Sequence, residues 1–139
     1  MVVQPIGIDN KAVLEAGITG PEDARTLAIA TGVAKFVFRG VGSDFVRSSI
    51  LIPTGVQIDD PTSENFRGAT ATASLASIAN DGPANNAGWA VDSVDVPGFF
   101  PPPGELTILV HVAVRDTDGF LLRIAYHVNV LLTRSPRAF

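Results

Sequence analysis

The chain has 139 residues, of which 46% are hydrophobic, and its 10 basic and 14 acidic side chains give a net charge of −4. The basic residues are scattered and do not form a stripe that would neutralise phosphates, so we expect no nucleic-acid partner. The absence of cysteine excludes disulfides, thiolate zinc sites and cysteine nucleophiles, and no apolar run approaches the roughly 18 to 20 residues of a membrane span.

The first eight residues, MVVQPIGI, are apolar and contain a proline. They carry no basic segment, so we do not expect them to be a signal peptide as written. A terminus this short does not fold alone, and it either frays or docks as an edge strand. We therefore predict an N-terminal arm and short helical segment over residues 1–26, followed by a β-sandwich domain over residues 27–139.

Two short helical turns are predicted within this first segment. Asp9 or Asn10 can cap a helix that runs through Ala16, and Gly17 provides its stop. Residues 19–26, TGPEDART, place a proline in a first-turn position with two acidic residues beside the positive end of the helix.

Apolar and polar residues alternate from residue 27 onward, with Gly, Pro and Asn clusters between the alternating runs. This period of two indicates half-buried strands. Several strands separated by turn residues predict an all-β, mainly antiparallel fold, either a β-sandwich or a jelly-roll-like barrel. The expected strands are 27–39, 46–52, 69–79, 88–96, 105–115 and 120–133.

The last two strands, 105–115 and 120–133, show the clearest alternation, with apolar side chains at the even positions of both. If both apolar faces share one side of a sheet, even positions must pair with even positions. A three-residue loop of Thr117, Asp118 and Gly119 produces that pairing, with Gly119 as the left-handed residue. We therefore predict that the two strands form a hairpin.

Asp116 and Asp118 also match the middle of a calcium-binding loop, in which oxygen ligands alternate before a glycine. The full pattern needs an Asp two positions earlier and a Glu at its end. Val114 occupies the earlier position, and no Glu follows Asp118. We interpret the segment as a turn and predict no metal there.

The predicted hairpin makes His111 and His127 diagonal neighbours on its polar face. Two imidazoles at this separation still need a third protein ligand to hold zinc, and we expect no carboxylate near them on that face. Solvent-facing or interface histidines are therefore predicted, and no metal or cofactor is expected.

The loop over residues 80–89, NDGPANNAGW, is the best candidate for ligand contact. An aromatic ring beside amide and carboxylate groups can bind a sugar, because the ring stacks on the sugar and the polar groups form hydrogen bonds with its hydroxyls. The same residue types are also common in sharp connections, and the tryptophan alternates with Val91 as a core residue would. The candidate contacts are Asn80, Asp81, Asn85, Asn86 and Trp89.

Catalytic signatures are absent from the sequence. No G-x-S-x-G segment or glycine-rich phosphate loop occurs, so we predict that the protein is not an enzyme and has no catalytic residues. Residues 97–105, PGFFPPPGE, are interpreted as a rigid crossover, with a docking surface as the alternative. The adjacent Asp59 and Asp60 are interpreted as part of a solvated turn.

Surface composition favours association with a partner. The mean hydropathy of +0.30 is high for a soluble monomer. Only Lys11 and Lys35 among the basic residues are lysines, and interfaces deplete lysine while they retain arginine. A GC-rich genome would produce the same bias.

We therefore predict a non-enzymatic, self-assembling structural subunit, such as a surface fibre, sheath, virion or tail component on an extracellular surface or in a virion. Copies of the chain would be its partners. In this hypothesis the arm leaves its own domain and adds a strand to the open sheet edge of a neighbour, and contacts of this head-to-tail kind propagate into a filament. The expected self-association residues are Val2, Val3, Ile6 and Ile8.

Two alternatives stay open at this point. The first is a carbohydrate-binding β-sandwich module that holds a glycan on Trp89 and the 80–89 loop. The second is a small barrel enzyme with two carboxylates in a closed cavity.

Overall fold

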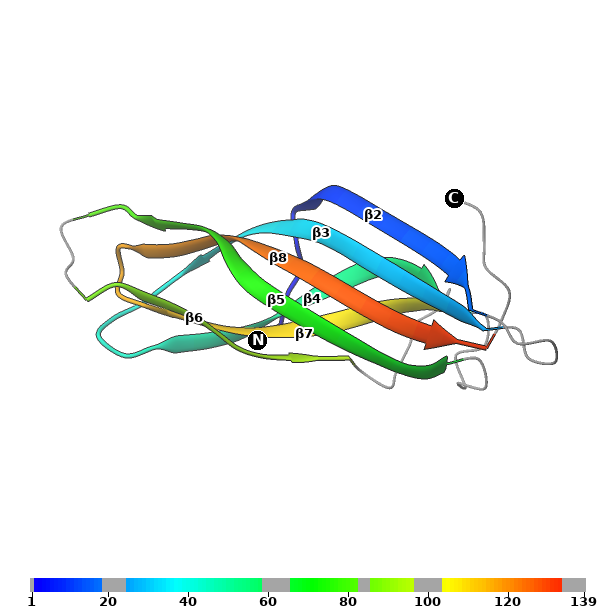
Figure 1. Ribbon diagram of the computed structural model, residues 1–139. Coiled ribbons are helices and arrows are strands. Elements are labelled where there is room, and N and C mark those ends of the chain that lie inside the picture. Colours follow the sequence, from blue (N-terminus) through cyan, green and yellow to red (C-terminus); the bar gives the residue numbers. More distant parts are fainter. Residues whose placement is uncertain (1, 19–24, 59–65, 83–85, 97–103, 134–139) are drawn as a thin grey trace.

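A computed structural model describes residues 2–18, 25–58, 66–82, 86–96 and 104–133, and these form a two-layer β-sandwich (Figure 1). The described residues contain strands and no helix, which confirms the predicted all-β class. The strands are β1 (Val2–Val3), β2 (Gly7–Gly17), β3 (Thr26–Arg39), β4 (Val46–Gln57), β5 (Phe66–Asn80), β6 (Gly88–Asp95), β7 (Glu105–Arg115) and β8 (Gly119–Leu132).

Each layer of the sandwich is a four-stranded sheet. Sheet A has the strand order β1-β4-β7-β6, and sheet B has the order β2-β3-β8-β5. All neighbours are antiparallel except β1 and β4, which are parallel. The pairs β3–β4 and β5–β6 cross from sheet B to sheet A on either side of β7 and β8, which gives the molecule a jelly-roll-like winding.

The β3–β4 and β7–β8 connections, two of those that cross between the sheets, lie together at one end of the sandwich (Figure 1). Main-chain hydrogen bonds join them there: Gly40 N–H donates to the carbonyl of Gly119 (3.0 Å), and Asp116 N–H donates to that of Gly42 (2.8 Å). Because buried or crowded main-chain groups need partners, these bonds fix the connections to one another.

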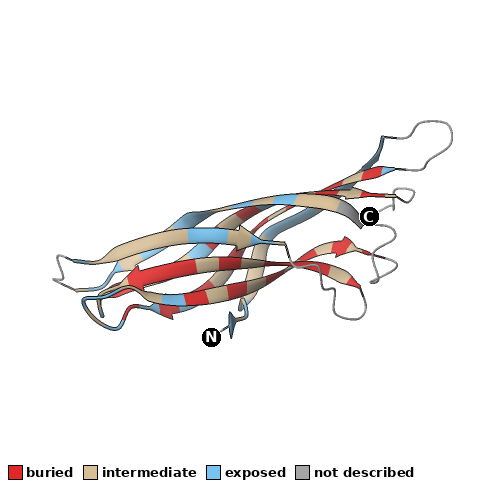
Figure 2. Ribbon diagram, turned by 90° about the horizontal axis from the view of Figure 1, so that it is seen from below, coloured by how far each residue is buried: buried red, intermediate tan, exposed pale blue. Residues whose placement is uncertain are grey.

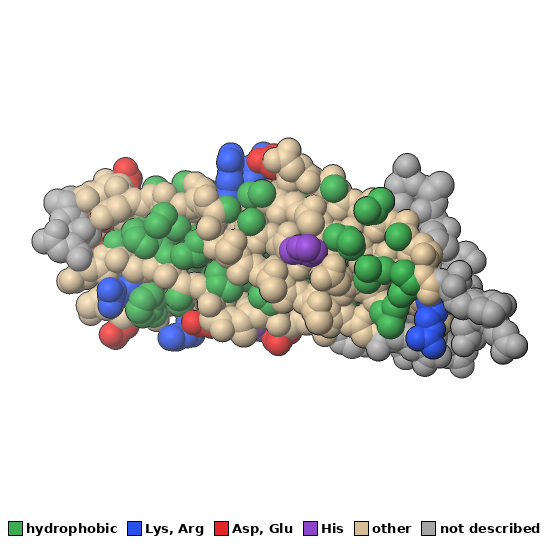
Figure 3. All heavy atoms as spheres, in the orientation of Figure 1, with side chains coloured by type: hydrophobic (Ala, Val, Ile, Leu, Met, Phe, Trp, Pro, Cys, Tyr) green, Lys and Arg blue, Asp and Glu red, His purple; other side chains and the backbone are tan. Residues whose placement is uncertain are grey.

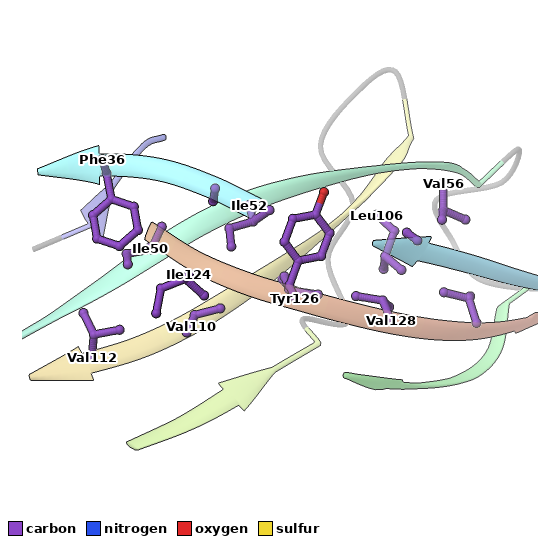
Figure 4. Close-up of a cluster of buried hydrophobic side chains, with 14 of the residues drawn as sticks. Phe36, Ile50, Ile52, Val56, Leu106, Val110, Val112, Ile124, Tyr126 and Val128 are labelled. Carbon is purple, nitrogen blue, oxygen red and sulfur yellow. The ribbon is translucent and has the colours of Figure 1, made fainter. Parts of the chain in front are cut away.

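The core lies between the two sheets, where alternate side chains of the facing strands meet (Figures 2 and 4). Val110 of β7 and Ile124 of β8 are fully buried, as are Ile50 and Ile52 of β4. Burying an aliphatic side chain of this size contributes about 1.5–3 kcal/mol relative to leaving it exposed. The alternation therefore places apolar residues where the sequence predicts them.

The predicted hairpin between residues 105–115 and 120–133 is wrong. β7 belongs to sheet A and β8 to sheet B, so the turn between them joins the two layers. Gly119 N–H donates to the carbonyl of Asp116 (3.1 Å) across this turn, and Asp116, not Gly119, has the left-handed conformation, with φ of 79°. The apolar faces of the two strands meet across the core, an arrangement that satisfies the alternation as well as one shared sheet does.

The predicted helix from Asp9 or Asn10 to Ala16 is also wrong, because these residues belong to β2, the strand at one edge of sheet B. Asn10 has φ of 54° and lies in a register shift between Asp9 and Ala12. Pairing with β3 overrides the local helical signal, as tertiary contacts commonly do. The second predicted turn falls mainly on residues 19–24, outside the described residues.

The N-terminal segment contributes an edge strand to each sheet. β1 pairs with β4, matching Val2 with Ser49 and Val3 with Ile50, while β2 lies beside β3. The division into an arm and a domain at residue 26 stays a prediction.

Candidate functional site

Three polar side chains are connected across the outer face of sheet A. Ser49 of β4 lies opposite His111 of β7, and the Ser49 Oγ is 2.8 Å from His111 Nδ1. The other ring nitrogen, Nε2, is 2.6 Å from Asp95 Oδ2 of β6. The histidine therefore bridges a hydroxyl group and a carboxylate that come from two different neighbouring strands.

This arrangement contains part of what nucleophilic catalysis needs. A histidine held by a carboxylate can accept a proton from a serine hydroxyl. Acyl transfer also needs donors aimed at the developing oxyanion. The main chain of Ser49 lies inside the sheet, between β1 and β7, so its amide does not face the open side of the cluster.

The sequence analysis missed Asp95 and predicted that no carboxylate lies near His111. Asp95 lies 16 residues from His111 along the chain, and Ser49 lies 62 residues away. Only the pairing of 88–95 with 105–115 brings the carboxylate to the imidazole. An antiparallel pairing of these two predicted strands was the one signal that could have found it.

The expected neighbourhood of His111 and His127 is wrong as well. His127 lies on β8, on the outer face of sheet B, so the two histidines are on opposite outer faces of the sandwich. His127 Nε2 is 3.2 Å from Asn129 Oδ1. Within the described ranges, no three His, Cys, Asp or Glu side chains are grouped so as to hold a metal ion.

The loop over residues 80–89 is tied into the crossing end of the sandwich. The Trp89 indole N–H donates to the Phe120 carbonyl (2.8 Å), and the ring packs against the core. The side chain of Arg115 donates from Nε to the carbonyl of Asn86, and Asp81 N–H donates to the carbonyl of Asp118.

The donor edge of Trp89 is therefore engaged within the protein, and the main chain of the loop is bonded to the neighbouring turn. Asn80 Oδ1 accepts a hydrogen bond from Gly82 N–H at 3.5 Å, as side chains of this type do in turns. Asn85, another candidate sugar contact, lies outside the described residues. The glycan hypothesis stays a prediction.

The four predicted self-association residues divide into two pairs. Val2 and Ile6 are 59% and 77% exposed, whereas Val3 and Ile8 are half-buried and pack against the core. A groove of about 310 Å³ runs beside the crossover from β1 to β2, and Pro5 forms part of its wall. The exposed pair is thus available at the surface, while the half-buried pair holds the segment against its own chain.

The outer face of sheet B has a broad uncharged area, which the pairing registers define (Figure 3). Three successive rows across its four strands contain no Lys, Arg, Asp or Glu, and His127 is their one titratable side chain. Charged groups begin in the next rows, where Asp9 lies 3.2 Å from Lys35. The three rows are Ala16–Leu27–Leu131–Gly68, Leu14–Ile29–Asn129–Thr70 and Ala12–Thr31–His127–Thr72.

Comparisons with known proteins add no assignment, since no family model, no curated protein and no solved structure matches the chain. Among the residues that the structure describes, no helix has the length and apolar character needed to cross a membrane.

Proposed function

We propose that the protein is a non-enzymatic structural subunit that assembles with copies of itself, with the outer face of sheet B as its principal contact surface. The observation that carries this proposal is the uncharged character of the three rows across that face. Charged residues are depleted at the centres of protein interfaces because their desolvation is costly. The neighbouring Asp9 and Lys35 would lie at the rim of the contact.

The size of this face sets the kind of contact it can make. Four strands about 4.8 Å apart and three rows about 6.8 Å apart cover roughly 400 Å². This is comparable to the largest apolar patch of a typical monomer, about 300–600 Å². It is about half of the 800 Å² that each partner buries in a standard interface. One such contact is weak, and assembly therefore requires repeated contacts or an enlarged surface.

The N-terminal arm provides a second contact in this proposal. β1 has two residues and pairs with two positions of β4, and Ile6 beyond it is exposed. Exchange of β1 between neighbouring copies would preserve the same pairing while linking the chains. Repeated exchange in one direction would build a filament, as in a fibre, sheath or tail.

The mass of the particle in solution tests the proposal. Light scattering after size-exclusion chromatography is expected to give a mass above that of one chain. Thr31→Lys, on a central strand of sheet B and in the third uncharged row, is expected to shift the population to monomers. Val37→Lys lies on the same strand and replaces a side chain that is already 60% exposed, so it serves as the control.

Two outcomes decide between the contacts. If the wild-type chain is monomeric at all concentrations, the proposed function is wrong. If Ile6→Asp, at the exposed arm residue, leaves the assemblies intact while Thr31→Lys dissolves them, the sheet face assembles the copies without exchange of the arm.

A further inference from the structure

Edge strands of a sheet present unpaired N–H and C=O groups, and natural proteins protect them with charged residues, prolines, bulges or very short strands. Three of the four terminal strands here have such protection. β1 is two residues long, β2 carries Lys11 and Glu15 beside a register shift, and β6 carries Asp92 and Asp95 beside another.

β5 is the least protected of the described edges, since its one charged residue, Arg67, lies at its start. Its residues 68–80 include no charged residue and no proline. From Gly68 to Leu75 it pairs with β8 in uninterrupted register, and the register shifts lie before and after this segment. The other side of β5 has no strand neighbour in sheet B (Figure 1). Eight residues of regular backbone therefore offer their free edge.

We propose that the free edge of β5 pairs with β5 of a second copy of this chain, antiparallel and about a two-fold axis, so that sheet B continues through eight strands. This inference rests on the proposed function, because it identifies the contact that enlarges the assembly surface. We infer that the partner strand is β5 of a second copy. In a two-fold contact, each residue near the axis lies opposite the same residue of the other copy or opposite a residue close to it in sequence. A segment without charge meets no like-charge repulsion in that arrangement.

The pleat of the strand limits the register of this contact. Residues that face each other across an antiparallel pair point to the same side of the sheet, so outward-facing Thr72 must oppose an outward-facing residue. If the axis passes at Thr72, this residue opposes itself, and Thr70 opposes Ser74 of the other copy. All three side chains are exposed in the single chain. Cross-strand Thr–Thr and Thr–Ser pairs stabilise antiparallel strands.

Pairing at this edge also explains how a small face can assemble. With the axis at Thr72, the third uncharged row of each copy continues into that of the other, and the two uncharged areas joined there total roughly 800 Å². That area matches what each partner contributes to a standard interface. Edge pairing therefore converts a weak contact surface into one of ordinary size.

Single cysteines provide the test, because the natural chain has none. Opposed Cα atoms in an antiparallel pair lie about 4.5–5.5 Å apart, within the range of about 4.4–6.8 Å that a disulfide spans. Oxidised Thr72→Cys is therefore expected to run as a covalent dimer on a non-reducing gel. Thr31→Cys lies in the same row but two strands from the edge, so edge pairing alone leaves it uncrosslinked.

Each result has a defined meaning. Crosslinking of Thr72→Cys, with or without Thr31→Cys, supports edge pairing. Crosslinking of Thr31→Cys alone overturns it but leaves the proposed assembly standing through contact between faces. Failure of both, together with a monomeric wild-type mass, overturns both proposals. Thr72→Lys provides a second measurement: with an unchanged circular dichroism spectrum, it is expected to give particles of lower mass, and an unchanged mass contradicts edge pairing.

Discussion

Trp89 of β6 donates its indole hydrogen to the main-chain carbonyl of Phe120 in β8 over 2.8 Å, and so connects the two sheets at the crossing end. Trp89→Phe removes this donor and leaves the carbonyl without it. We expect the free energy of unfolding to fall by about 1–2 kcal/mol. Urea denaturation followed by circular dichroism measures the change. Val37→Ala, at an exposed position, is the control, and an equal loss there would contradict a specific role for the indole bond.

Gly40 and Gly42 form a matched pair at the same end of the molecule. A Cβ added at Gly40 would collide with the carbonyl oxygen of Asp116, whereas a Cβ at Gly42 would meet nothing within 4 Å. Because the Asp116 contact is main chain, it cannot move aside as a flexible side chain can. We expect Gly40→Ala to lose at least about 2 kcal/mol and Gly42→Ala to stay within about 0.5 kcal/mol of the natural chain.

Thermal denaturation of these two variants side by side gives the comparison. Similar melting temperatures for both would show that the contact between residues 40 and 116 does not limit the packing of this end.

Tyr126 is buried, and its hydroxyl has no hydrogen-bond partner among the described residues. A buried polar group without a partner opposes folding, and its removal relieves that cost. Tyr126→Phe is therefore expected to raise the free energy of unfolding near neutral pH by about 1 kcal/mol. A loss of stability in urea denaturation would instead indicate that the hydroxyl has a partner.

The same residue predicts a dependence on alkaline pH. Burial, and secondarily the charge of Glu105, raise the pKa of Tyr126 above the ordinary value of 10.0. The neutral phenol is then favoured in the folded state, and its contribution to stability is present below pH 10 and lost as the pH rises through the folded pKa. We expect the natural chain to lose more stability above pH 10 than Tyr126→Phe does.

Tyr126 is the one tyrosine of the chain, so ultraviolet difference titration follows it directly. A midpoint at or below 10.0 would contradict the effect of burial.

The Ser49–His111–Asp95 cluster tests whether the protein is an enzyme. We expect a fluorophosphonate probe to leave Ser49 unmodified, because the main chain at Ser49 runs within the sheet and gives no amide toward the open side of the cluster. Intact mass spectrometry of the natural chain and Ser49→Ala measures this. Modification of the natural chain that Ser49→Ala abolishes would favour a hydrolase.

Alternation along the sequence predicts the all-β class and most strand positions, because inward and outward residues must differ wherever one face is buried. It does not predict which strands share a sheet. The even-numbered residues from Leu106 to Val114 face the core as expected, but Phe120 is only half-buried while its neighbour Leu121 is fully buried. The pairing of β3 with β8 shifts register between Lys35 and Phe38, and β8 changes faces at this point while β3 keeps its alternation.

Breakers predicted from the sequence can also lie inside a strand. β4 continues through Pro53 and Gly55, although the sequence predicts that the strand stops at residue 52. Proline has no amide hydrogen to donate to a neighbouring strand. The described pairing of β4 with β1 ends at Ile50, so on the β1 side no described strand lies beside Pro53 to need that hydrogen bond. Thr54 Oγ1 donates to the carbonyl of Leu106 and holds the extension in place.

The candidate site was less accessible to sequence analysis than the fold. The outer face of sheet B depends on which outward residues of β2, β3, β5 and β8 become neighbours, and this follows from the strand order. The residues of the arm could be named from the sequence. The sequence does not predict which of them are exposed and which are packed. The structure shows that Ile6 is exposed and that Ile8 packs on the core.

One of the two central strands of each sheet comes from the last two strands of the described chain. β7 lies between β4 and β6, and β8 lies between β3 and β5. During synthesis, therefore, sheet A cannot close until β7 has left the ribosome, and β3 and β5 have no strand that joins them in sheet B until β8 has followed. Folding then proceeds through contacts distant in sequence, which is intrinsically slow, and a chain that stops before β8 exposes unpaired strands to other nascent chains.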